Sequence, residues 1–189
     1  MLRDLFYSTR TCRTFDESRI ITRDELCDMV DCARLTPSSA NIQPLTYRLV
    51  YKKDECEKLQ PLTKWAGALP ELDLPPSRHR PTAFIVICQD TERFGDASKF
   101  KVDVGICALA IYMRAAEMGL AGCMIGSFNK ESTAEVLSLP ENTVPLLIIA
   151  LGKADEARKI VPLKDGQTKY YRENGVHLVP KRELDDIII

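Results

Sequence analysis

Two segments of the chain are apolar almost without interruption, TAFIVIC at residues 82–88 and PLLIIALG at residues 145–152. Apolar runs of this length without polar alternation are typical of strands that are buried on both faces. Both segments are therefore expected to be central strands of a sheet. Such a sheet needs helices to cover it, so the fold is expected to combine strands with packed helices.

Two further segments have the pattern of helices that could cover this sheet. In the first, Thr22 stands three residues before Glu25, which is the spacing of a capping box, and Pro37 ends the helical pattern. The second, KFKVDVGICALAIYMRAAEMG at residues 99–119, is apolar nearly all round in its middle part. A helix that is apolar on more than one side is expected to lie in the core or in a dimer interface.

The remaining segments complete an α+β, or mixed α/β, chain. The proline-rich stretch 67–81 is expected to be irregular, and the apolar end DDIII is expected to pack on something, such as a partner subunit. At 189 residues the chain is most simply a single domain, 1–189. Shorter helices are expected at 2–8, 54–60 and 130–139, and shorter strands at 46–52 and 121–126.

Composition and charge argue against several classes of function. The net charge is -1, which gives no basic surface for nucleic acid. The longest apolar runs are too short to span a bilayer, and the first residues, MLRDLFYSTRTCR, contain no signal-peptide core. The 7 cysteines form no C-x-x-C pair and stand far from both histidines, so they indicate free thiols and no metal site. We expect a cytoplasmic protein without a membrane or nucleic-acid partner.

Arg10, Thr11 and Arg13 form the first polar cluster that could bind a ligand. Two guanidinium groups with a hydroxyl between them suit a phosphate, because each arginine offers a fork of hydrogen-bond donors. The same residues could also form an ordinary solvated basic turn, since arginine pairs are common on protein surfaces. The sequence alone leaves both interpretations open.

The segment RLTPSSANIQPL at residues 34–45 contains the second cluster. Ser38, Ser39, Asn41 and Gln43 carry groups that donate and accept hydrogen bonds, as a ring with alternating carbonyl and N–H groups requires. The alternative is a helix end followed by an Asx-type turn, which uses the same residue types. Here too both interpretations stay open.

Lys181 and Arg182 are a third candidate, although two adjacent basic residues are more commonly a solvated edge. The nucleotide-binding motifs G-x-G-x-x-G and P-loop are absent from the sequence. A G-x-S-x-G elbow is also absent, and Ser38 has no histidine near it, which argues against a hydrolase. Trp65 and the two histidines are expected to be packing or surface residues.

The order of these segments resembles the nitroreductase family of FMN-dependent oxidoreductases, its short members in particular. The resemblance extends from about residue 3 to the end, through RTCRTFDES, ARLTPSSANIQPL, DVGICALAIYMRAAEMGLAGCMIGSF, IIALGK and VPKRELDDII. It implies a mixed central sheet flanked by helices, in an intertwined homodimer with an exchanged C-terminal extension. Thr9 departs from the family, because many relatives have a second basic residue there, so Lys181 and Arg182 are expected to matter more.

The resemblance also implies which residues bind FMN. Arg10, Thr11 and Arg13 would hold its phosphate, ribityl chain and pyrimidine edge, with Lys181 and Arg182 adding a basic pair at the phosphate. A loop would bind the ring across the dimer interface, and the end of a strand would lie beside the ring. The loop residues are Pro37, Ser38, Ser39, Asn41 and Gln43, and the strand-end residues are Ile125 and Gly126. No functional residue is assigned in 61–81, which varies with substrate in the family.

The implied activity is electron transfer from NAD(P)H to a small-molecule acceptor, such as a nitroaromatic or a quinone, with FMN as the hydride carrier. This ping-pong scheme needs no side-chain nucleophile or base, so no catalytic residue is predicted. The alternative is a flavin-binding store or sensor of the same fold without turnover. A dimer that has lost the cofactor is disfavoured, because Arg10, Arg13, Ser38 and Asn41 are all present.

Overall fold

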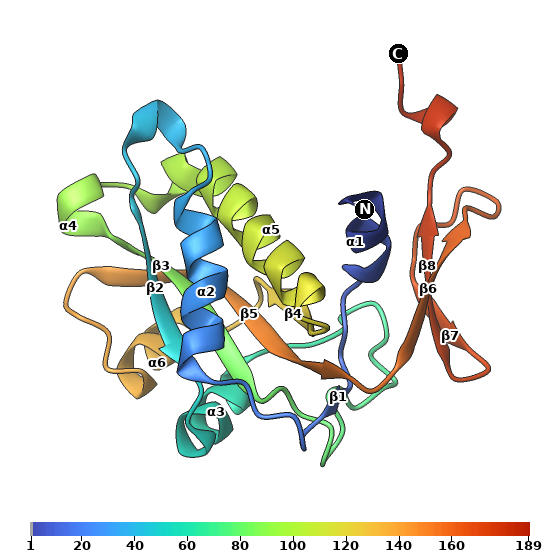
Figure 1. Ribbon diagram of the computed structural model, residues 1–189, viewed down its shortest axis with the longest axis horizontal. Helices are drawn as coiled ribbons and strands as arrows, with labels where there is room; N and C mark the ends of the chain where they lie inside the picture. The colour runs from blue at the N-terminus through green and yellow to red at the C-terminus, as the bar shows by residue number, and fades with distance from the viewer. Residues whose placement is uncertain (1) are drawn as a thin grey trace.

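The computed structural model describes residues 2–189; helices and strands largely alternate as far as residue 154, and three more strands follow (Figure 1). The helices are α1 (Leu2–Ser8), α2 (Arg23–Arg34), α3 (Lys53–Leu59), α4 (Thr91–Phe94), α5 (Lys101–Glu117) and α6 (Lys130–Val136). The strands are β1 (Phe15–Asp16), β2 (Leu45–Val50), β3 (Ala83–Asp90), β4 (Ala121–Ile125), β5 (Thr143–Ala154), β6 (Ala157–Pro162), β7 (Tyr171–Glu173) and β8 (Val176–Lys181). The expected α+β class is confirmed.

Strand β5 is the centre of a five-stranded sheet. It pairs with β3 and with β4 over the same stretch, 148–151, so these two strands must lie along its opposite edges. Strand β2 extends the sheet beyond β3, and β1 pairs with the last residues of β5. The two apolar segments are therefore neighbouring central strands, as predicted.

The strand directions correct one expectation. The central sheet was expected to be mixed, but its pairs β1–β5, β2–β3, β3–β5 and β4–β5 are all antiparallel within residues 2–189. The parallel pair of the structure, β6–β8, lies in the second, smaller sheet. Uninterrupted apolar strands show burial on both faces, but they do not report strand direction.

Both faces of the central sheet are covered, because successive side chains of a strand point to opposite sides. On one face, Ile85 and Ile149 belong to a core that also contains buried residues of α2 and α5. On the other face, Phe84 and Ile148 belong to a core that includes Leu59 of α3. This two-sided burial is the physical reason for the uninterrupted apolar runs.

The predicted helix signals are confirmed. The Thr22 side chain accepts a hydrogen bond from the Glu25 backbone, and the Glu25 carboxylate accepts one from the Thr22 backbone at 2.8 Å. Helix α2 ends at Arg34, before Pro37, and Gly119 takes the left-handed conformation (φ 73°) just after α5. Residues 67–81 form no helix or strand, as expected.

The three-stranded sheet β6–β8–β7 was not predicted. In Figure 1 this sheet and the C-terminal end form an arm that stands off from the central sheet. Its strands are short and carry many charged residues, so their sequence is hard to distinguish from a polar tail. We call residues 157–189 the C-terminal arm.

Within residues 2–189, no helix is long and apolar enough to cross a membrane. No group of three or more histidine, cysteine, aspartate or glutamate side chains there is arranged to hold a metal ion. The 7 cysteines are all free thiols.

Candidate functional site

Arg13 is buried between the start of the chain and the C-terminal arm. Only 7% of it is exposed, and its Nη1 lies 3.2 Å from Nε2 of His177 on β8. The guanidinium carbon lies 4.5 Å from the centre of the Tyr170 ring, a cation–π distance. The Arg13 backbone N–H donates to Glu156 at 2.5 Å. A solvated turn is therefore the wrong interpretation for this arginine.

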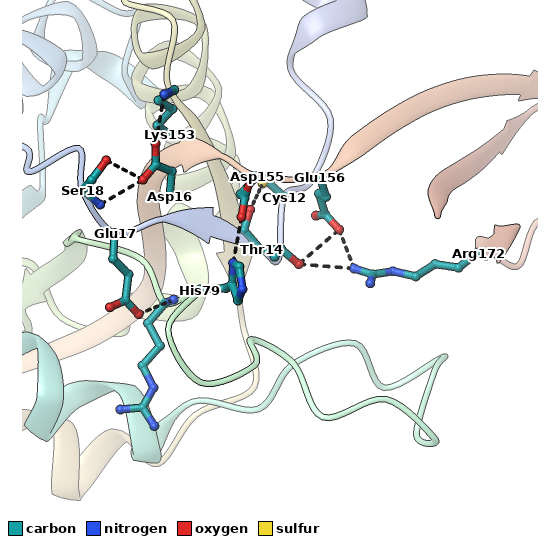
Figure 2. Close-up of polar contacts among 11 residues, drawn as sticks. Cys12, Thr14, Asp16, Glu17, Ser18, His79, Lys153, Asp155, Glu156 and Arg172 are labelled. Atoms are coloured by element: carbon teal, nitrogen blue, oxygen red, sulfur yellow. Dashed lines mark hydrogen bonds and ion pairs between the residues drawn. The ribbon is translucent and has the colours of Figure 1, made fainter. Parts of the chain in front are cut away.

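The surroundings of Arg13 carry an excess of positive charge. Arg10 and Arg158 lie together, since Nη1 of Arg158 donates to the Arg10 carbonyl at 2.5 Å. The carboxylate of Glu156 binds Arg172 and also accepts from Thr14 at 3.4 Å, as Figure 2 shows. Glu156 is thus the carboxylate in a group with four arginines, Arg10, Arg13, Arg158 and Arg172. We call this group the N-terminal cluster.

Two hydrogen-bond donors of the N-terminal cluster lack acceptors among the described residues. The Nε atoms of Arg10 and Arg13 are buried, and neither has a hydrogen-bond partner among the described residues. Burial lowers the pKa of Arg10, and the Arg158 cation beside it acts in the same direction. Thr11 is half-buried, and its side chain is hydrogen-bonded to the phenol of Tyr112. Excess positive charge with donors lacking acceptors suits an anion such as a phosphate.

His177 makes the stability of this cluster dependent on pH. Burial lowers its pKa and the Arg13 cation lowers it further, so the folded chain binds a proton less readily than the unfolded chain does. The free energy of unfolding is therefore expected to fall as pH drops below about 6.5. In His177→Gln this acid-side slope should flatten, measured as melting temperature against pH. An unchanged slope in His177→Gln would contradict the assignment.

The second cluster is held by a residue that the sequence analysis missed, Asp103 of α5. The Ser38 hydroxyl donates to Asp103 Oδ1 at 2.6 Å, and the Ser39 hydroxyl donates to Oδ2 at 2.6 Å. The Ser39 backbone N–H also donates to Oδ1, at 2.9 Å. Only 1% of Asp103 is exposed. An acidic residue in the first turn of a largely apolar helix is the signal that could have indicated it.

The two serines therefore brace the loop through Asp103, with Ser38 half-buried and Ser39 exposed. Ser38 also accepts a hydrogen bond from the Gln43 backbone N–H at 3.0 Å, which closes the loop on itself. Ala40, Asn41 and Gln43 have positive φ values of 46°, 55° and 53°. Such conformations are unfavourable for residues other than glycine. The bonds to Asp103 offset this strain and keep the loop in one shape.

Asn41 and Gln43 are the exposed polar groups of this braced loop. Nε2 of Gln43 donates to Oδ1 of Asn41 at 3.0 Å and to its carbonyl at 3.2 Å. This leaves the Asn41 amide N–H as a donor and the Gln43 Oε1 as an acceptor, side by side. A ring edge that carries both N–H and C=O groups matches such a pair. A cavity of about 180 Å³ opens beside the loop and is lined by Ser38, Gln43 and Asp103.

The other predicted residues are distributed over two places. Ile125 is buried in the core at the end of β4, whereas Gly126 is exposed, with open space where a side chain would stand. Its backbone is therefore accessible to a flat ligand. Lys181 and Arg182 are exposed at the end of β8, where Arg182 donates to the Asp186 carbonyl. Within one protomer this pair has the character of a solvated edge.

The predicted residues do not form one pocket within a single chain. In Figure 1 the loop that follows α2 lies at the top, far from β1 and the N-terminal cluster. Pro37 lies in this loop and is exposed. The structure thus assembles two partial sites, the N-terminal cluster with the arm and the braced loop with α5.

Comparison with known proteins gives a consistent result. The family model described as "Nitroreductase family" matches residues 7–153. The oxygen-insensitive NADPH nitroreductase of Helicobacter pylori is 27% identical over 181 residues, covering 80% of this chain and 86% of the relative.

Solved structures share the fold. A nitroreductase family protein of Streptococcus pneumoniae has a TM-score of 0.68 at 18% identity, covering 100% of this chain and 99% of its own. A protein of Exiguobacterium sibiricum, solved in complex with FMN, has a TM-score of 0.66 at 18% identity, covering 82% and 89%.

Proposed function

The chain belongs to the nitroreductase family, and from this premise we propose that it is an FMN-dependent oxidoreductase. It would transfer electrons from NAD(P)H to a small-molecule acceptor such as a nitroaromatic or a quinone. The observation that carries the proposal is the N-terminal cluster, where four arginines gather near Glu156, and the buried Nε atoms of Arg10 and Arg13 have no hydrogen-bond partner among the described residues. The phosphate of FMN has the charge and the acceptor oxygens that this cluster lacks.

Residues of the chain would hold the cofactor in three ways. Arg10, Thr11 and Arg13 would bind the phosphate end, with Lys181 and Arg182 adding charge from the arm. Asn41 and Gln43 would contact the ring edge, while Pro37, Ser38 and Ser39 give the loop its shape. The backbone at Ile125 and Gly126 would lie beside the ring. FMN itself would supply the hydride chemistry when bound, so no catalytic side chain is assigned.

A second subunit would bring the two partial sites together, and we propose a homodimer in which the loop of one chain completes the site of the other. Helix α5 supports this. Val102 and Leu109, seven residues apart, lie on a face of the helix that does not contact the core, and they are 69% and 42% exposed. The end of the arm is also apolar and exposed, from Ile187 to Ile189. Apolar patches of this kind are typical of interfaces. Light scattering should give twice the mass of one chain.

The purified protein is expected to be yellow, with the absorbance of oxidised FMN, and to lose that colour when NADH or NADPH is added without oxygen. A nitroaromatic or a quinone should then restore it. Colourless protein that takes up no added FMN would overturn the proposal. Bound flavin that neither nucleotide bleaches would instead support the alternative, a flavin store or sensor. The expected location in the cytoplasm stays a prediction.

A further inference from the structure

A cavity of about 420 Å³ lies apart from every residue assigned to FMN. Its size is within the range of small-molecule sites, which is roughly 300–1,000 Å³. The turn after β1, one face of α3 and the stretch that enters β3 form its walls. Lys53 and Cys56 of α3 and Gln60, directly after its end, contribute at the spacing that places side chains on one helix face.

Polar contacts hold these walls together. The Arg80 backbone N–H donates to Glu17 at 2.8 Å, which ties the entry to β3 to the turn after β1. The Thr82 hydroxyl donates to the Arg19 carbonyl at 2.9 Å and makes a second tie. The Cys56 thiol lies 3.6 Å from the Thr82 carbonyl and links α3 to the same stretch. The cavity is thus lined by segments that are fixed to one another, and it stays open to solvent at its rim.

The rim of the cavity has cationic groups in excess. Lys53, Arg78 and Arg80 line it together with two carboxylates, of which Glu17 is already bound to a backbone N–H. The other, Glu57, lies 3.9 Å from Lys53 in an exposed and weak ion pair. Within residues 2–189, neither the Arg78 nor the Arg80 guanidinium has a hydrogen bond or an ion pair. Two arginine forks are therefore available to an anion.

Below the rim, the cavity wall is mainly apolar, and it includes one hydrogen-bond acceptor without a donor among the described residues. Ile20, Tyr51 and Pro81 contribute apolar surface to the lining. Gln60 also lines the cavity, and its Oε1 is buried without a hydrogen-bond partner among the described residues. Burial raises the pKa of Cys56 to about 12, so this thiol stays protonated and unreactive. The cavity therefore has the features of a binding site and lacks those of a catalytic one.

We propose that this cavity binds a small aromatic carboxylate that carries a hydroxyl or amino group at the end remote from its carboxylate. The carboxylate would be held by Arg78 and Arg80 at the rim. The ring would pack on Ile20 and Tyr51, and the remote group would donate to Gln60 Oε1. This site is independent of FMN, because none of its residues belongs to the proposed cofactor site.

Calorimetric titration with 4-hydroxybenzoate tests the proposal. Saturable binding at one site per chain is expected, and it should weaken at high salt because the contact is ionic. The double variant Arg78→Gln/Arg80→Gln should raise Kd by about tenfold or more, since charge-assisted hydrogen bonds are lost. The control, Arg3→Gln/Lys164→Gln, makes the same change in net charge at two other exposed positions and should leave Kd unchanged.

Two further ligands test the two ends of the site. Benzoate, which has no remote donor, should bind more weakly than 4-hydroxybenzoate to the parent protein, and Gln60→Leu should abolish that difference. The neutral 4-hydroxybenzamide should bind equally to the parent and to the arginine double variant. The proposal is overturned if 4-hydroxybenzoate shows no saturable binding, or if the double variant binds it as well as the parent does. Melting temperatures show that each variant is folded.

Discussion

Replacing Arg13 with alanine is expected to weaken FMN binding by about 1.5–3 kcal/mol, or roughly 10- to 150-fold in Kd. Arg13 is 7% exposed, its Nε has no partner among the described residues, and its neighbours Arg10 and Arg158 leave the cluster short of negative charge. A phosphate would supply the missing acceptors, and alanine removes the donors that would meet it. Quenching of FMN fluorescence on titration into apo-protein measures the change.

Two control variants separate binding from folding. Arg13 packs between Tyr170 and His177, so Arg13→Ala also removes contacts that stabilise the arm. Arg13→Met keeps most of the apolar stem without the charge and should lose FMN affinity while remaining closer to the parent in melting temperature. Arg34→Ala breaks an exposed ion pair with Asp31 and should change neither quantity by much. Parent-like affinity in both Arg13 variants would place the phosphate elsewhere, with Lys181 and Arg182 as the next candidates.

Replacing Asp103 with alanine is expected to lower the free energy of unfolding by about 3 kcal/mol. The variant leaves the hydroxyls of Ser38 and Ser39 without their buried acceptor, and it removes the bonds that offset the strained loop. Urea denaturation measures this loss. Asp103→Asn keeps one acceptor oxygen and should lose less. Asp31→Ala, at an exposed carboxylate of α2, is the control and should be nearly neutral.

The pH dependence of the same residue has a defined sign. Burial acts to raise the pKa of Asp103, but the hydrogen bonds from Ser38 and Ser39 outweigh it and lower the pKa below its ordinary value. The stability that Asp103 contributes is therefore present above the ordinary carboxylate pKa and is lost as pH falls below it. If the proposed function is right, Asp103→Ala also weakens FMN binding through the shape of the loop. A loss of stability of less than about 0.5 kcal/mol would show that Asp103 does not brace the loop.

The apolar strands and the capped helix could be predicted because their signals are local. Residues 82–88 and 145–152 are buried on both faces, and Thr22 and Glu25 form the expected capping box. The arm could not be predicted in the same way. Its strands β6 and β8 pair directly with each other although β7 lies between them in the sequence, and their mixed polar and apolar residues carry no clear period.

The sequence by itself determined the class of the fold, the order of the main helices and strands through β5, and the residue types of both polar clusters, because periodicity, capping and composition act over a few neighbouring residues. Only the tertiary structure decided what those polar groups do. It pairs Ser38 with Asp103, 65 residues away, and Arg13 with His177, 164 residues away. Contacts at such separations depend on how the helices and the arm pack in space. For that reason the role of Ser38 and Ser39 as braces of the loop, through Asp103, could be seen only in the tertiary structure.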